Sequence, residues 1–182
     1  MRDKFRGRDF LTLMEFTREE INDILSVSFD LKMKWAKREP HEYLRGKTIA
    51  IVFEKPSTRT RTSLQAAIAH LRAQSFYMRT DEMQLARGEP IKDTARVIDR
   101  YCDGLVMRTF GQDRLEEFAR YMKNPVINAL SDLTHPCQGL ADLLTIREKK
   151  GDFKGLKLAY AGDIWNVCHS LMIGGGIMGF DV

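Results

Sequence analysis

Hydrophobic positions along the chain repeat in two ways, which predict alternating strands and helices. The β-branched run at 48–53 (TIAIVF) is typical of a short buried strand, and Leu64, Ala67, Ile68 and Leu71 follow it at helical spacing. The same alternation continues with strands near 75–79, 104–108 and 125–129 and helices near 58–73, 91–101, 113–122 and 136–149. Helices of this length between strands indicate right-handed βαβ units. We therefore expect an α/β fold, a parallel sheet of about four strands flanked by helices.

An additional helix is predicted ahead of the first strand. Thr17 is a suitable N-cap, and Glu20 stands three residues later, as a capping box requires. Phe16 and Ile21 occupy the two positions of a hydrophobic staple. The apolar stripe that follows predicts a helix ending near Trp35.

The pattern changes after residue 150, where the glycine-flanked segment GDFKG indicates a hinge. Beyond the hinge, 156–161 predicts a strand, and Asn166 begins a helical pattern. We expect 1–150 to form one domain. Residues 151–182 are then expected to be the beginning of a truncated second α/β domain, its first strand and helix.

Composition describes a globular protein. Of 182 residues, 43% are hydrophobic and 30% charged, and no apolar run approaches the length of a membrane span. The N-terminal segment lacks the apolar core of a signal peptide, so we expect a cytoplasmic location and no membrane partner. The cysteines, Cys102, Cys137 and Cys168, show neither paired nor zinc-ligand spacing. We expect no structural disulfide and no metal.

Charge points to a small anionic ligand. The net charge is +4, but the basic residues are spread among 25 acidic ones, without a long Lys/Arg run. This distribution does not favour a nucleic-acid partner.

The segment from Phe53 to Arg61 (FEKPSTRTR) concentrates phosphate-binding chemistry at a predicted helix start. Free backbone N–H groups and the positive end of the helix dipole favour an anion there. Ser57, Thr58 and Thr60 add hydroxyl donors, and the guanidinium of Arg59 matches phosphate oxygens in pairs. Taken singly, Ser57 would be only an N-cap and the arginines solvated, but the occurrence of all these residues within nine consecutive positions predicts a phosphate site.

Other polar residues follow later strands in the same way. Arg108 ends one predicted strand, and the turn from His135 to Gln138 follows the next. Ligands of parallel sheets bind beyond the carboxyl ends of the strands. We therefore expect one pocket to hold both groups together with the turn at 57–60.

Three ordered motifs resemble the carbamoyltransferases, in which an S-T-R-T-R turn binds the phosphate of carbamoyl phosphate. The chain carries this turn at 57–61 and the family motif H-P-C-Q-x-L-A-D at 135–142. The cysteine of the second motif and the block QLARGEPIKDTAR at 84–96 resemble the ornithine branch. The resemblance implies transfer of a carbamoyl group from carbamoyl phosphate to ornithine, giving citrulline and phosphate, without a metal or organic cofactor.

The resemblance also implies roles for single residues. It assigns the phosphate to Ser57, Thr58, Arg59 and Thr60, the carbonyl oxygen to Arg108 and His135 as catalytic donors, and the carbamoyl amide to Gln138. Cys137 lies within the motif, but free cysteines are commonly buried, and we do not expect it to be a nucleophile.

A loop residue is implied as a shared contact. Gln84 lies in a polar loop that, in relatives, reaches the active site of the neighbouring subunit of a trimer. The resemblance therefore implies a homo-oligomer, with Gln84 as a ligand contact. From the residues alone, this stretch reads as a solvated loop.

The sequence departs from the family pattern at the start of the second domain. Ornithine enzymes open it with G-D-G-N-N, where this chain has Gly162-Asp163-Ile164-Trp165-Asn166. Asn166 is a candidate ornithine contact or, equally, a helix cap. The later S-M-G and H-C-L-P segments are absent, so only the carbamoyl phosphate half is expected. Two alternatives stay open: a carbamoyltransferase for another amine, and a non-catalytic carbamoyl phosphate-binding module.

Overall fold

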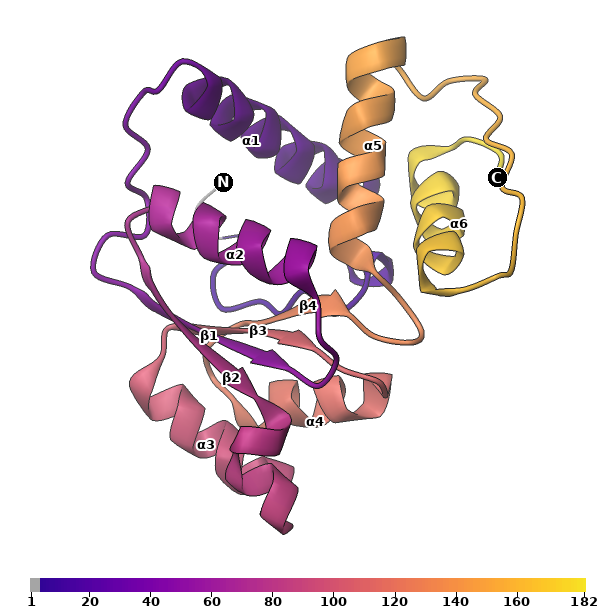
Figure 1. The fold of residues 1–182 in the computed structure, drawn as a ribbon. Helices are drawn as coiled ribbons and strands as arrows, with labels where there is room; N and C mark the ends of the chain where they lie inside the picture. Colours follow the sequence, from indigo (N-terminus) through magenta and orange to yellow (C-terminus); the bar gives the residue numbers. More distant parts are fainter. Residues whose placement is uncertain (1–3) are drawn as a thin grey trace.

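Four parallel strands form the central sheet in the computed structural model, which describes residues 4–182. They lie in the order β2-β1-β3-β4 (Figure 1). Their bounds are β1 Thr48–Phe53, β2 Gln74–Arg79, β3 Gly104–Arg108 and β4 Val126–Leu130. The predicted parallel α/β sheet is therefore confirmed, and each strand lies within one residue of its predicted bounds.

Helices cover both faces of this sheet. They are α1 Arg18–Ala36, α2 Thr58–His70, α3 Ile91–Tyr101, α4 Gln112–Tyr121, α5 Pro136–Lys150 and α6 Asn166–Met178. Helices α1, α2 and α5 lie on one face and α3 and α4 on the other (Figure 1). This division follows from right-handed crossovers, because the connection from β1 to β2 runs across the sheet in the opposite direction to the two that follow it.

The central strands are buried on both faces, which explains their continuous apolar composition. In β1, Ala50 and Val52 join the core beneath α3 and α4, while Ile51 and Phe53 join the core beneath α2. All four side chains are almost fully buried. The TIAIVF run is apolar throughout because neither face of this strand meets water.

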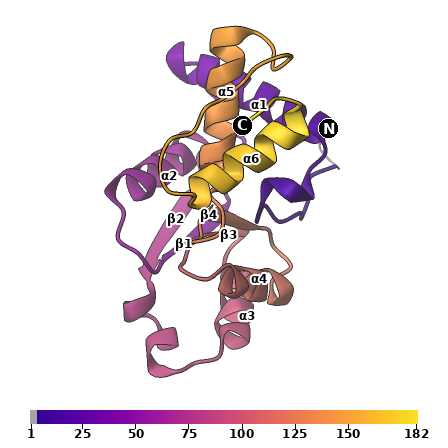
Figure 2. The ribbon, with the colours of Figure 1, turned by 90° about the vertical axis from the view of Figure 1, so that its right-hand side faces the viewer.

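Residues after 150 pack against the helical layer that contains α1 and α5. Figure 2 shows α6 crossing close to α5. Phe153, Met178 and Phe180 share one buried cluster with Ile21 and Leu25 of α1. The C-terminal segment thus contributes to a core formed together with the first 150 residues.

A glycine allows the close approach of α6 to α5. A Cβ atom at Gly139 of α5 would lie 3.2 Å from the Cβ of Ser170 on α6 and 3.0 Å from Leu13 Cδ1. Any larger residue would push these elements apart.

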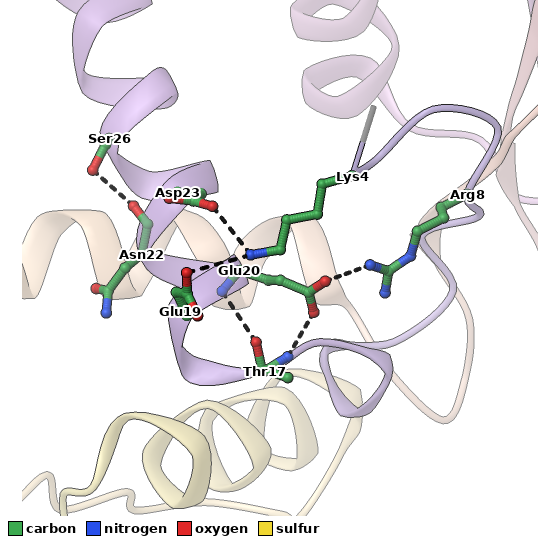
Figure 3. Close-up of polar contacts among 8 residues, drawn as sticks. All are labelled: Lys4, Arg8, Thr17, Glu19, Glu20, Asn22, Asp23 and Ser26. Atoms are coloured by element: carbon green, nitrogen blue, oxygen red, sulfur yellow. Dashed lines mark hydrogen bonds and ion pairs between the residues drawn. The ribbon is translucent and has the colours of Figure 1, made fainter. Parts of the chain in front are cut away.

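The predicted capping box at the start of α1 is present (Figure 3). Thr17 Oγ1 accepts a hydrogen bond from the backbone N–H of Glu20 at 3.2 Å, and the Glu20 carboxylate accepts from the N–H of Thr17 at 2.9 Å. The Thr17 hydrogen bond, and after it the pairing of Arg8 with the same carboxylate, lowers the pKa of Glu20. Lys4 adds ion pairs to Glu19 and Asp23 in the first turns.

One predicted strand is wrong. Within the described chain, 156–161 forms no strand, and only an isolated parallel bridge joins Lys157 to Asp181. A strand needs a hydrogen-bonded neighbour along its length, and a single pairing does not supply one. Conversely, Phe10 bridges Ile127 beside β4, a pairing that the sequence pattern did not indicate.

Candidate functional site

The loops that follow β1, β3 and β4 meet at one end of the sheet. The chain order reverses between β1 and β3, because the chain passes from β1 to β2 on one side and returns to β3 on the other. Ligands of open α/β sheets bind at such a reversal, beyond the carboxyl ends of the strands. The first turn of α2, the end of β3 and the start of α5 all lie at this end (Figure 1).

A cavity of about 500 Å³ opens at this point, which we call the central cavity. Six predicted site residues line it: Ser57, Arg59, Thr60, Arg108, His135 and Gln138. Ligand sites of small molecules commonly have this size. The structure therefore brings together residues from three loops, separated by up to about eighty positions in the sequence.

The remaining predicted residues lie elsewhere. Thr58 lines a neighbouring hollow together with Lys55 and Arg61. Gln84 begins a short 3-10 helix, Gln84–Arg87, in the loop between β2 and α3. Asn166 is the first residue of α6, where its side chain donates to the carbonyl of Ser131 at 2.8 Å and does not cap the helix.

The N-terminus of α2 forms the wall of the central cavity whose groups are suited to bind a phosphate. Ser57 is the N-cap, and its hydroxyl accepts from the N–H of Thr60 at 3.4 Å. Capping leaves the O–H of Ser57 free to donate, so the observed cap is compatible with a hydrogen bond to an anion. The first turn carries arginines and hydroxyls in place of acidic side chains, which suits an anion at the positive end of the helix dipole.

Two buried nitrogens in the central cavity have no hydrogen-bond partner within residues 4–182. They are Nε of Arg108 and Nδ1 of His135. The other end of the Arg108 guanidinium donates to Thr60 Oγ1 at 3.4 Å. Buried polar atoms are normally paired, so the protein itself leaves the polar groups of these two cavity-lining residues incompletely satisfied.

Burial and charge keep His135 neutral. Desolvation, together with a smaller contribution from the positive charge of Arg108, lowers its pKa from the ordinary value near 6.5 to about 4. A neutral imidazole has one N–H and one free nitrogen lone pair. At neutral pH the residue is therefore suited to donate a hydrogen bond without carrying a full charge.

Gln138 and Cys137 belong to the first turn of α5. Gln138 Nε2 donates to Asp142 Oδ1 at 2.9 Å, one helical turn later. Burial raises the pKa of the Cys137 thiol to about 11, and the thiol donates to the carbonyl of Asn128 at 3.3 Å. A protonated, hydrogen-bonded thiol is a poor nucleophile.

Glu54 and Lys55, which the sequence reasoning did not single out, connect the three loops. The backbone N–H of Glu54 donates to the carbonyl of Arg108 at 2.8 Å. Its carboxylate accepts from Thr109 Oγ1 and from the N–H of Phe110. These bonds hold the backbone that directly follows the Arg108 side chain. Lys55 pairs with Asp132 of the loop between β4 and α5, so consecutive residues link the ends of β1, β3 and β4.

Helix α6 holds the loop that carries His135. Ser170 Oγ accepts from the N–H of His135 at 2.8 Å, and His169 Nδ1 lies 2.8 Å from the carbonyl oxygen of Leu133. With Asn166, these residues stand at i, i+3 and i+4 on one helix face. The spacing of these residues in the sequence indicates that they share one helix face. Their partners in the loop become visible only in the folded structure.

The donors of the central cavity are suited to an anion joined to a carbonyl. Hydroxyls, a helix N-terminus and Arg59 form one wall, while Arg108 and His135 form another. Within the described residues, no group of three or more His, Cys, Asp or Glu side chains is arranged to hold a metal ion.

These features define a class, an α/β domain with hydroxyl and arginine donors at a helix N-terminus and an arginine–histidine pair beside them, a set suited to a phosphorylated carbonyl ligand. Comparison with known families agrees. The family model of the aspartate/ornithine carbamoyltransferase, carbamoyl-P binding domain, matches residues 8–148. The chain therefore belongs to the aspartate/ornithine carbamoyltransferase family.

Similar proteins of known name include ornithine carbamoyltransferases. That of Pyrococcus horikoshii is 51% identical over 178 residues, covering 97% of this chain and 56% of the relative. That of Geobacter sulfurreducens is 49% identical over 175 residues, covering 96% of this chain and 58% of the relative. This chain thus spans about half the length of these relatives.

Solved structures agree in fold. Ornithine carbamoyltransferase from Pyrococcus furiosus superposes with a TM-score of 0.93 at 49% identity, covering 96% of this chain and 56% of that one. Aspartate transcarbamoylase from Trypanosoma cruzi, in complex with carbamoyl phosphate and aspartate, superposes with a TM-score of 0.87 at 29% identity, covering 96% of this chain and 58% of that one.

In the described part of this chain, no helix has both the length and the apolar character needed to cross a membrane.

Proposed function

We propose that the central cavity binds carbamoyl phosphate, and that the chain is the carbamoyl phosphate half of an ornithine carbamoyltransferase. The observation that carries the proposal is the convergence of Ser57, Arg59 and Thr60 with Arg108 and His135 around one cavity. The relatives of about 50% identity that bear the name ornithine carbamoyltransferase support it.

The arrangement suits carbamoyl transfer by electrostatic stabilisation. As an amine attacks the carbonyl carbon, negative charge grows on the carbonyl oxygen and on the departing phosphate. The guanidinium of Arg108, with an unpaired buried nitrogen, and the neutral His135 are the donors for the carbonyl oxygen. Arg59 and the hydroxyls at the start of α2 neutralise the phosphate as the C–O bond breaks. No nucleophile of the protein is needed.

Ornithine as the acceptor is part of this proposal, and one observation favours a second candidate. Ile164 and Trp165, which replace a glycine and an asparagine of the family motif, are 67% and 60% exposed. Apolar side chains at this position favour a less polar amine. Analysis of the carbamoylated products formed from ornithine and from a series of other amines separates the two candidates.

The division of the chain, its assembly and its location remain proposals. We infer that 151–182 begins the amine-binding domain, supported by the end of the family match at residue 148. Asn166 is proposed as a contact of the amine substrate, and this proposal is supported only by its place in the family motif. A homotrimer, with Gln84 reaching a neighbouring subunit, and a cytoplasmic location rest on the family resemblance.

Phosphate affinity tests the site directly. In Arg59→Ala, loss of a charge-assisted contact worth roughly 1.5 to 3 kcal/mol should weaken binding of inorganic phosphate by about one to two decades. Isothermal titration calorimetry measures the change. Arg61→Ala is the matched control, because its guanidinium stacks 3.6 Å from the centre of the Tyr77 ring and lines the neighbouring hollow. Equal affinity in the wild type and Arg59→Ala would refute the assignment.

A further inference from the structure

The hydrogen bond between Gln138 and Asp142 determines which end of the Gln138 amide faces the ligand. Gln138 lines the central cavity, and its Nε2 lies 2.9 Å from Asp142 Oδ1. An ionised carboxylate accepts hydrogen bonds and donates none, so only the NH2 end of the amide can face it. The position of the carboxylate therefore identifies the end of the Gln138 amide near Asp142 as the NH2 group and the other end as the oxygen, Oε1.

The remaining end of the amide is a free acceptor. Within residues 4–182, Oε1 of Gln138 has no hydrogen-bond donor, while Ser57, Arg59, Thr60, Arg108 and His135 supply donors to the same cavity. Gln138 thus presents an acceptor in a cavity otherwise rich in donors. A ligand that satisfies it must carry an N–H or O–H beside its anionic and carbonyl groups.

We propose that Asp142 is a specificity-determining positioning residue. It holds Gln138 with Oε1 toward the cavity, so that the site accepts an N–H from the carbamoyl NH2 and discriminates against acyl phosphates that carry a methyl group there. The inference rests on the proposed function and adds to it the basis of selection between carbamoyl and acetyl phosphate.

The expected discrimination follows from the unpaired acceptor. A methyl group in place of NH2 has almost the same shape, but it offers no N–H to Oε1 and displaces the water that would otherwise donate to it. Sites built to hydrogen-bond a substrate group reject analogues that lack the group more strongly than apolar pockets reject a change of size. We expect a preference of about ten- to a hundred-fold for the amide.

The same contact has a simpler interpretation, a helix-stabilising pair at i and i+4 on α5. Such a pair would contribute to the stability of the helix and would not distinguish one ligand from another. The ratio of two ligand affinities therefore separates the interpretations, because a change in stability alone leaves this ratio constant.

The decisive experiment uses two stable probes, phosphonoacetamide and 2-oxopropylphosphonate, which differ by NH2 against CH3. Their affinities, with that of inorganic phosphate as reference, are measured by calorimetry in the wild type and in Asp142→Asn. The asparagine is nearly isosteric, but its NH2 group can donate to Oε1 of Gln138 and allow the Gln138 amide to turn over. We expect the amide-to-ketone ratio to fall at least several-fold toward one, with the phosphate affinity unchanged.

Two further variants complete the test. Gln138→Met should remove the preference through loss of the acceptor itself, and Asp142→Ala, which leaves Gln138 free to rotate, should reduce it if Asp142→Asn does not fold. A wild-type ratio retained in Asp142→Asn or Asp142→Ala would overturn the inference, as would a wild type that binds phosphate without preferring the amide. A wild type that binds none of the three probes would instead overturn the proposed function, and this inference with it.

Discussion

Replacing His135 with glutamine should change the way in which stability depends on pH. In the folded protein, burial and the charge of Arg108 lower the pKa of His135 to about 4, from an ordinary value near 6.5 that applies to the unfolded chain. Between these two values the unfolded state binds more protons than the folded state. Stability is therefore complete above pH 6.5 and falls as the pH falls toward 4.

The size of the effect follows from the shift. A change of one pKa unit corresponds to about 1.4 kcal/mol, so the full loss below both pKa values is about 3 kcal/mol. At pH 5, between the two values, the loss is about 2 kcal/mol. Glutamine does not titrate, so the variant lacks this contribution.

Urea denaturation at pH 7.5 and pH 5 measures it. The free energy of unfolding of the wild type, minus that of His135→Gln, should decrease by about 2 kcal/mol between the two conditions. Carboxylates and the other histidines occur in both proteins, and their contributions cancel in the difference. A difference that is the same at both pH values would refute the argument that His135 is buried and neutral.

Two further predictions concern the folded state. Thr17→Ala should lower the free energy of unfolding, measured by urea denaturation, by about 1 kcal/mol, because the N–H of Glu20 loses its acceptor (Figure 3). The control Ser26→Ala, on the same helix, should change the free energy of unfolding by less than about 0.5 kcal/mol. Glu54→Ala should lower the free energy of unfolding by about 2 kcal/mol in the same assay, since the buried hydroxyl of Thr109 and the N–H of Phe110 lose their acceptor, and it should weaken phosphate binding in calorimetry. Unchanged stability would contradict the role of Glu54 in holding the loop after Arg108.

Sequence alone determined the elements whose causes are local. The TIAIVF strand, the Thr17 capping box and the order of strands and helices depend on residues within a few positions of one another, and all are present. The prediction of a phosphate site at Ser57 to Arg61 has the same local basis, since a helix start and its hydroxyls need no distant partner.

Local pattern misled where the outcome depended on a partner. Residues 156–161 have the composition of a strand, but only Lys157 is paired, through its bridge to Asp181. The segment at Phe10 shows the converse, because it gains a neighbour in Ile127 that its own sequence does not indicate. Strand formation depends on hydrogen bonds to a second segment, which periodicity does not contain.

Only the tertiary structure decided how the site residues work together. It brought Arg108 and His135 to one cavity, where burial and a neighbouring charge shift the pKa of the histidine. It also gave Glu54 and Ser170 their partners in loops about 55 and 35 positions away. Burial, electrostatic shifts and long-range hydrogen bonds depend on distances in space, and the fold sets those distances.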